Sequence, residues 1–187
     1  MKISAIMALM KKSKTINLYK QNGKQWISNG RAAYAVHCLP ELDNDQLCVI
    51  AGIPESKAAD YNINTEAEWL EVFNEKPAEG ELLFERRNAV TYCTNGALYE
   101  ALTDAEGRVW LVDTKYLRPI RDYDAEALSF YITKGSDKVP VIRVRAGLLL
   151  IAIITLTSPS KAFCDELKAI SDFIQPDDEP ELEENDD

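Results

Sequence analysis

The side chains that could do chemistry in this chain are mostly basic, and they gather near its N-terminal end. The first 40 residues hold seven basic residues and no acidic one: Lys2, Lys11, Lys12, Lys14, Lys20, Lys24 and Arg31. An exposed charge acts over only about 10 Å at moderate salt, so a basic face can meet a polyanion even though the formal net charge is -10. The alternative interpretation is an ordinary solvated face.

Residues for covalent or acid–base catalysis are scarce. The single histidine, His37, adjoins Cys38, but neighbours on a strand point to opposite faces, so the two are poorly placed as base and nucleophile. The chain contains no GxGxxG, GxxxxGK[ST], HExxH or DxDxDG motif, and so lacks the usual phosphate and metal ligands. We therefore predict no catalytic residue, no cofactor and no enzymatic activity.

Metal binding is not indicated either. Glu41, Asp43 and Asp45 cluster at the start of a predicted helix, where the helix dipole favours acids without any metal. The four cysteines are unevenly spaced and lack a CxxC pair, so we interpret them as core thiols of a protein in the reducing cytoplasm. The tryptophans, Trp26, Trp69 and Trp110, are expected to be core or interface anchors, and the alternative for Trp26 is stacking on a nucleobase.

Acidic residues are concentrated at the other end of the chain. Residues 172–187 hold nine carboxylates and no basic residue, which leaves the rest of the chain nearly neutral. Residues 175–187 are too polar to form a core, so we expect a disordered acidic tail there. Such a tail could be solubilising, dock to a basic partner, or compete with nucleic acid for the protein's own basic face.

The first half of the chain predicts a helix followed by a β-meander. Apolar residues Ile3, Ile6, Met7 and Met10 have helical spacing within residues 2–12. Three segments of alternating polarity follow, separated by Asn22-Gly23 and Asn29-Gly30, which are tight-hairpin signals. These segments are Thr15–Lys20, Lys24–Ser28 and Ala32–Val36. Residues 41–78 look like an insertion with two helices, Asp43–Ala51 and Thr65–Asn74, the second with Thr65 as its cap and Glu68 completing a capping box.

The second half predicts more strands and two further helices. A short helix at Asp113–Arg121 is limited by Pro119, and a last helix covers Ser160–Phe173. The longest apolar run, Leu148–Leu156, is about half of what a membrane-spanning helix needs, so it is predicted to be a buried strand and no membrane contact is expected. The predicted strands are Glu81–Glu85, Ala89–Cys93, Leu98–Thr103, Arg108–Val112, Leu128–Thr133, Val139–Arg145 and Leu148–Ile154.

The order of elements occurs twice. Residues 2–36 give helix and three strands, and residues 108–154 give strand, helix and three strands. Short consecutive strands joined by tight turns favour an α+β fold with antiparallel sheets, built from two βαβββ-like modules. We expect one domain over residues 1–174, in which the two module helices lie side by side.

Residues 112–156 resemble the closing module of DNA polymerase sliding clamps. In that family a strand leads into a helix with a Tyr-Leu pair, followed by a strand, a turn, a strand with a Pro-Val-hydrophobic segment and a final apolar strand. The matching segments here are Val109–Val112, Tyr116-Leu117, Leu128–Ile132, Pro140-Val141-Ile142 and Leu148–Ile154. The whole chain also resembles small proteins of bacteriophages and integrated elements of Gram-positive bacteria. A clamp subunit normally has two or three such domains, whereas this chain has room for one.

The resemblance implies which residues would meet DNA. In sliding clamps the module helices face the duplex, and the corresponding helices here are basic. The implied DNA-binding residues are Lys2, Lys11, Lys12, Lys14, Lys115, Arg118 and Arg121. Contacts from Lys and Arg to phosphates ignore base sequence and weaken as salt rises. For Lys115, Arg118 and Arg121 the alternative is a solvated helix face.

Two functions from different classes remain open at this point. The first is a non-enzymatic DNA-associated protein of clamp-like fold that surrounds or cradles duplex DNA as a homo-oligomer and tethers a replication partner. The second is a protein-interaction module that has the fold without DNA binding and uses strand edges and the acidic tail. Open sheet edges would provide the contacts of a homo-oligomer. Both belong in the cytoplasm.

Overall fold

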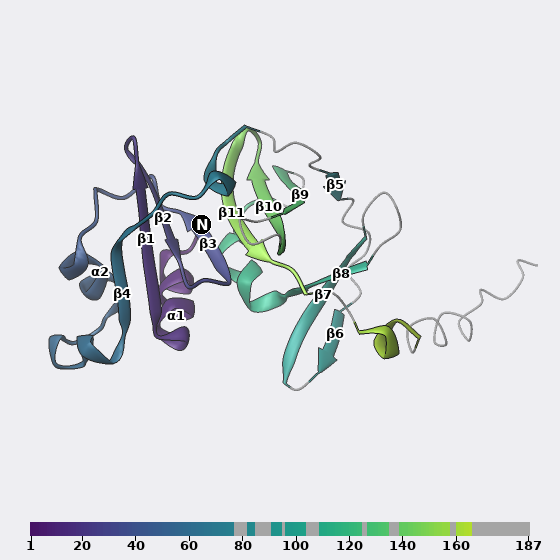
Figure 1. The fold of residues 1–187 in the computed structure, drawn as a ribbon, viewed down its shortest axis with the longest axis horizontal. Helices are drawn as coiled ribbons and strands as arrows, with labels where there is room; N and C mark the ends of the chain where they lie inside the picture. The colour runs from purple at the N-terminus through teal and green to yellow at the C-terminus, as the bar shows by residue number, and fades with distance from the viewer. Residues whose placement is uncertain are drawn as a thin grey trace, which may run out of the picture. The chain divides into compact units, whose positions relative to one another are not determined.

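The computed structural model describes residues 1–76, 82–84, 91–94, 96–103, 109–124, 127–134, 139–157 and 160–165. The chain divides into two compact units, Met1–Thr157 and Ser158–Asp187. The first unit contains an eight-stranded sheet, a three-stranded sheet and short helices, so the predicted α+β class with mainly antiparallel sheets is confirmed (Figure 1).

The first module is the predicted helix and three-stranded meander. Its elements are α1 (Ile3–Ser13), β1 (Thr15–Gln21), β2 (Lys24–Ser28) and β3 (Ala32–Ala35). Asn22 and Gly23 both adopt positive φ, 51° and 75°, as a two-residue hairpin turn requires. The Asn29-Gly30 turn differs, because only Gly30 has positive φ and the Asn29 side chain accepts hydrogen bonds from the N–H groups of Arg31 and Ala32.

The second module repeats this arrangement. Its elements are β8 (Val109–Asp113), η3 (Thr114–Ile120), β9 (Leu128–Lys134), β10 (Pro140–Ala146) and β11 (Leu149–Thr155). The main sheet has the order β4-β1-β2-β3-β11-β10-β9-β5, so the meanders of the two modules mirror each other across the β3–β11 pair. The module helices pack against each other, as predicted, and the N–H of Lys2 donates to the carbonyl of Pro119 at 2.9 Å.

Two apolar clusters occupy the two faces of the main sheet. Under α1 and η3, the larger cluster includes Ile6, Met10, Leu117 and Ile120 together with alternate residues of the strands. On the other face, a second cluster is covered by residues 69–76, which we call the strap. This segment contains η2 (Glu71–Phe73), whose Phe73 ring stacks on Trp26 with ring centroids 5.0 Å apart.

The buried Arg143 side chain attaches the strap to the sheet. Its guanidinium donates to the main-chain carbonyls of Asn74 and Lys76, and its neighbours on β10, Ile142 and Val144, face the helix side. The Glu75 carboxylate also pairs with Lys24 at 2.8 Å. The strap thus covers the face of the sheet that is opposite to the two module helices.

The prediction of a helix at Thr65–Asn74 is wrong. Residues Asn62–Ala67 form strand β4, which pairs in parallel with β1 at the edge of the sheet, and only Glu71–Phe73 are helical. Ile63, a β-branched residue, packs against the larger apolar cluster, whereas Asn62 and Asn64 are exposed. Alternation along an available sheet edge outweighs the capping-box pattern of Thr65 and Glu68, which lies within and just after the strand.

The rest of the inserted segment begins with α2 (Asn44–Ala51) and η1 (Glu55–Asp60). Asp43 caps α2, because its carboxylate accepts the N–H of Gln46 at 2.8 Å while the Gln46 side chain accepts the N–H of Asp43. Gly52 ends the helix in the left-handed conformation, with φ of 61°. This capping role accounts for the acidic residue at position 43.

The remaining described strands are β5 (Leu82–Phe84), β6 (Thr91–Thr94) and β7 (Ala97–Thr103). β5 closes the far edge of the main sheet, and β6, β7 and β8 form the three-stranded sheet. In the second unit residues 161–165 are helical, and the Ser160 hydroxyl accepts the N–H of Phe163 at this helix start. Residues 166–173 of the predicted last helix and the acidic tail lie outside the described residues. No helix among the described residues is both long and apolar enough to span a bilayer.

Candidate nucleic-acid interface

Three of the predicted DNA-binding residues form a row along η3. This helix is a 3₁₀ helix, in which residues three apart lie above one another. Lys115, Arg118 and Arg121 therefore share one side, with a rise of about 6 Å per step. The row Thr114, Leu117 and Ile120 faces the core and is buried. We call Lys115, Arg118 and Arg121 the η3 row.

The segment predicted to be a short helix limited by Pro119 forms the 3₁₀ helix η3. Pro119 lacks an N–H and limits regular α-helical bonding, as the sequence indicated. In an α-helix, residues 115, 118 and 121 would drift around the axis, whereas three residues per turn keep them aligned. The alignment of these cations thus follows from the helix type.

Lys115 is held by an acidic partner inside the protein. The Asp113 carboxylate caps η3, accepting the main-chain N–H of Lys115 at 3.1 Å, and it also binds the Lys115 ammonium. Partial burial alone would lower the pKa of Lys115, but the hydrogen bond and charge of Asp113, with a contribution from Tyr116, outweigh it and raise the pKa. Lys115 is therefore a fixed and already paired cation.

Arg118 and Arg121 are exposed, and within the described part of the chain their guanidinium groups make no ion pair or hydrogen bond. Lys2 is distant from them in sequence but close in space, because its N–H donates to the carbonyl of Pro119. The Lys2 ammonium pairs with Asp122 at 2.9 Å, and both side chains are largely in solvent, with exposed fractions of 59% and 44%. Lys2 is thus placed at the Arg121 end of the η3 row, where η3 ends.

The other three predicted residues lie at the opposite end of α1. Lys11 and Lys12 are in its last turn, about 14 Å along the axis from Lys2, and Lys14 is the residue that ends it. The Lys11 ammonium donates to the carbonyl of Gly52 at 3.2 Å, while Lys12 and Lys14 are exposed. The seven residues therefore form two groups: Lys2 with the η3 row, and Lys11, Lys12 and Lys14.

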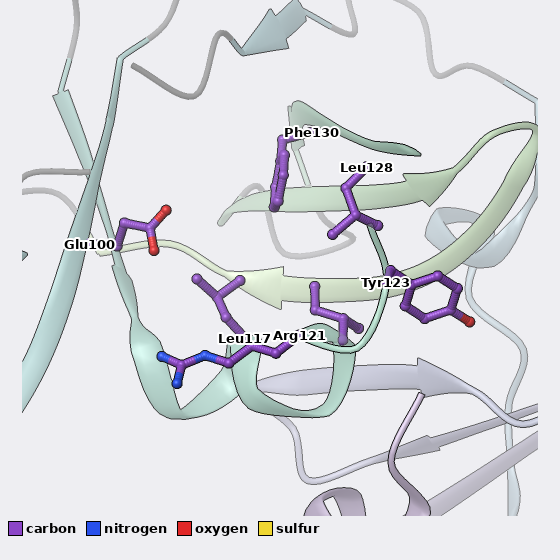
Figure 2. A pocket seen from close by; sticks show the side chains of 7 residues that line it. Glu100, Leu117, Arg121, Tyr123, Leu128 and Phe130 are labelled. Carbon is purple, nitrogen blue, oxygen red and sulfur yellow. The ribbon is translucent and has the colours of Figure 1, made fainter. Parts of the chain in front are cut away.

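A hollow of about 270 Å³ borders the η3 row. Figure 2 shows Leu117 and Arg121 extending from η3 along one side, Leu128 and Phe130 on another, and the Glu100 carboxylate of β7 turned toward the hollow. Most of its lining is apolar, and its charged groups are the buried Glu100 and the exposed Arg121. Arg121 thus belongs both to the row and to the rim of this hollow.

Several other sequence interpretations can be checked against the structure. Trp26 is 1% exposed beneath the strap, so the alternative of stacking on a nucleobase is wrong. His37 accepts the N–H of Gln25 through Nδ1 at 3.1 Å, which gives it a structural role at the end of the meander. The description of the cysteines as core thiols is also wrong, because Cys38, Cys93 and Cys164 are exposed and Cys48 is half-buried; all four are free thiols.

The acidic partners of the basic residues were not predicted from the sequence. Asp113 and Asp122 flank the η3 row in sequence, and this proximity is a signal that could have indicated them. Among the described residues, no group of three or more His, Cys, Asp and Glu side chains is arranged to hold a metal ion. Comparisons of the chain with protein-family models, curated proteins and solved structures gave no match.

Proposed function

We propose that this chain is a non-enzymatic DNA-associated protein that holds duplex DNA against α1 and η3 and tethers a replication partner to it in the cytoplasm. The observation that carries the proposal is the η3 row, in which Arg118 and Arg121 share one side of a helix fixed to α1 and have no ion pair or hydrogen bond among the described residues. The mirrored modules with adjacent helices support it, since that arrangement is what the clamp resemblance implies.

The proposed contact is electrostatic and independent of base sequence. Arg guanidinium groups bind phosphate oxygens in a bidentate manner and stay charged at all accessible pH values. Each neutralised phosphate releases condensed counterions, so the logarithm of the affinity falls with the logarithm of salt concentration by about 0.9 per contact. Weak binding of this type lets a protein move along DNA.

The experiment is retention of closed circular plasmid, which has no ends from which a surrounding protein can slip. Arg118→Glu/Arg121→Glu should lower retention at low salt by at least about tenfold, because two phosphate contacts become repulsions. The control is Arg31→Glu/Lys76→Glu, which makes the same change of charge at exposed positions away from α1 and η3. An equal loss of plasmid retention in both variants, or no retention of plasmid by the wild-type protein, would contradict the proposal.

Self-association is part of the proposal. β4 has only β1 as a partner in the described sheet, so its outer edge offers unpaired backbone groups to another strand. We expect a sedimentation mass above the 21.0 kDa of one chain at high micromolar concentration. The N–H of Asn62 faces β1, where it binds the carbonyl of Lys14, so the N–H of Thr65 faces the free edge. Thr65→Pro removes that outward N–H and should reduce the mass if this edge forms the contact. A monomer throughout the concentration range would count against a ring.

The second candidate is a protein-interaction module without DNA binding. The β10–β11 turn favours it, because Leu148 and Leu149 are 90% and 60% exposed at its tip. Adjacent apolar side chains in solvent are typical of contact surfaces when they form part of a patch. If plasmid is not retained while Leu148→Ser/Leu149→Ser alters the sedimentation mass, this function replaces the first.

A further inference from the structure

The ion pair between Lys2 and Asp122 lies beside the arginine end of the η3 row, whose Arg118 and Arg121 have no ion pair within the described part of the chain. Asp122 directly follows Arg121, and the main-chain bond from Lys2 to Pro119 holds the start of α1 at this place. A carboxylate on the Lys2 ammonium occupies the position that a phosphate oxygen would take on the same nitrogen. Asp122 is therefore both a partner of Lys2 and a competitor for any anion that binds there.

We propose that Asp122 regulates this surface by exchange: a DNA phosphate replaces the Asp122 carboxylate on Lys2, so that Lys2 joins Arg118 and Arg121, while Asp113 keeps Lys115. The inference rests on the proposed function and specifies how its site works. The four cations then have three roles. Arg118 and Arg121 are always available to phosphates, Lys2 becomes available when Asp122 is displaced, and Lys115 only positions the helix.

The two ion pairs differ in the properties that decide whether exchange occurs. The Lys2–Asp122 pair is largely in solvent, where an ion pair contributes little to stability, so a phosphate can displace the carboxylate at little cost. In the Lys115–Asp113 pair the side chains are 37% and 13% exposed, and Asp113 also caps η3. Separating Asp113 from Lys115 would leave a largely buried carboxylate without its cation, so this ion pair stays formed.

The test measures plasmid retention and its salt dependence for Asp122→Asn. Removal of the competing carboxylate should raise affinity about two- to fivefold at low salt, the range that corresponds to an exposed ion pair. The matched control is Glu75→Gln, which removes the carboxylate of the Lys24–Glu75 pair. That pair has a similar distance, 2.8 Å, but lies on the strap side of the sheet. The Glu75→Gln substitution should leave the affinity for plasmid nearly unchanged, although it changes the net charge as much as Asp122→Asn does.

A second arm separates exchange from a general charge effect. Lys2→Gln should reduce the salt slope by about 0.9, the value of one phosphate contact. In the Lys2→Gln background, Asp122→Asn should give no further gain. Equal gains from Asp122→Asn and Glu75→Gln, or a gain that persists without Lys2, would overturn the inference while wild-type retention leaves the proposed function intact. Absence of wild-type retention would remove both.

Discussion

The hydroxyl of Tyr34 donates to the main-chain carbonyl of Tyr116 at 2.7 Å, joining β3 of the first module to η3 of the second. In a 3₁₀ helix this carbonyl would accept the N–H of residue 119, which is Pro119 and has none. Tyr34 supplies the missing donor from within the core, where burial raises the pKa of its hydroxyl, with smaller contributions from Tyr116 and Asp113, and keeps it protonated. The position of the η3 row thus depends on a residue more than 80 positions away in sequence.

Tyr34→Phe should lower the free energy of unfolding by about 1–3 kcal/mol, because it leaves a buried carbonyl without that donor. Urea denaturation measures the change. Tyr61→Phe is the control: no hydrogen bond from its hydroxyl occurs within the described residues, and a change within about 0.5 kcal/mol is expected.

A double-mutant cycle tests the role assigned to Pro119. Pro119→Ala provides an N–H at the position where the 3₁₀ pattern needs it, so Tyr34→Phe should cost less in that background. Equal costs with and without Pro119 would mean that the Tyr34 hydroxyl does not compensate for the proline.

Arg143→Leu should destabilise the protein by about 2–4 kcal/mol, because the carbonyls of Asn74 and Lys76 lose their guanidinium donors. Limited proteolysis followed by mass spectrometry should then show new cleavage within the strap. Lys76→Glu, which changes the exposed side chain but keeps the carbonyl, should leave the strap protected. An unchanged cleavage pattern in Arg143→Leu would show that the apolar contacts of Phe73 are enough to hold the strap.

Local patterns predicted the fold where each segment's own periodicity decides its structure. Ile6, Met7 and Met10 are buried along α1 as their spacing indicates, and Asn22-Gly23 forms the predicted turn. The segment Thr65–Asn74 shows the limit of this approach. Its capping signal is local, whereas its strand is stabilised by pairing with β1, some 45 residues earlier, which propensity does not include.

The candidate site was predictable in composition but not in arrangement. Charge counting found the basic residues, and the resemblance placed them on two helices. The row of Lys115, Arg118 and Arg121 depends on the three-residue repeat of η3, and the pairing of Lys2 with Asp122 depends on the packing of α1 on η3. The first is a property of the helix type and the second of tertiary packing, and a pattern of charges contains neither.

Lys14→Gly should separate stability from DNA binding at the far end of α1. Lys14 ends the helix with φ of 54°, in the left-handed conformation that costs a non-glycine residue about 1–2 kcal/mol. Glycine removes this cost but has a larger unfolded-state entropy, so we expect a net gain of about 0.5–1 kcal/mol in unfolding free energy. Plasmid retention should fall, because one cation is lost.

Lys14→Ala is the matched control, since it removes the same charge and keeps the unfavourable backbone conformation. It should weaken retention as much as Lys14→Gly without the gain in stability. If neither variant changes retention, the group Lys11, Lys12 and Lys14 does not contact DNA, and the interface is confined to Lys2 and the η3 row.

His37 should titrate below the ordinary histidine pKa of about 6.5. Burial lowers its pKa first, and the nearby Lys24 ammonium lowers it further, while the Glu75 carboxylate acts in the opposite direction. In addition, Nδ1 accepts the N–H of Gln25, and a protonated Nδ1 cannot accept a hydrogen bond. The folded state therefore favours neutral imidazole. The stability that this group contributes is present above pH 6.5 and is lost as pH falls from there through the folded-state pKa.

Because the chain has one histidine, its NMR signal identifies the titration directly. Glu75→Gln should lower the midpoint further, and His37→Gln should remove the loss of stability in this window. A wild-type midpoint at or above 6.5 would show that the Glu75 carboxylate outweighs burial and Lys24.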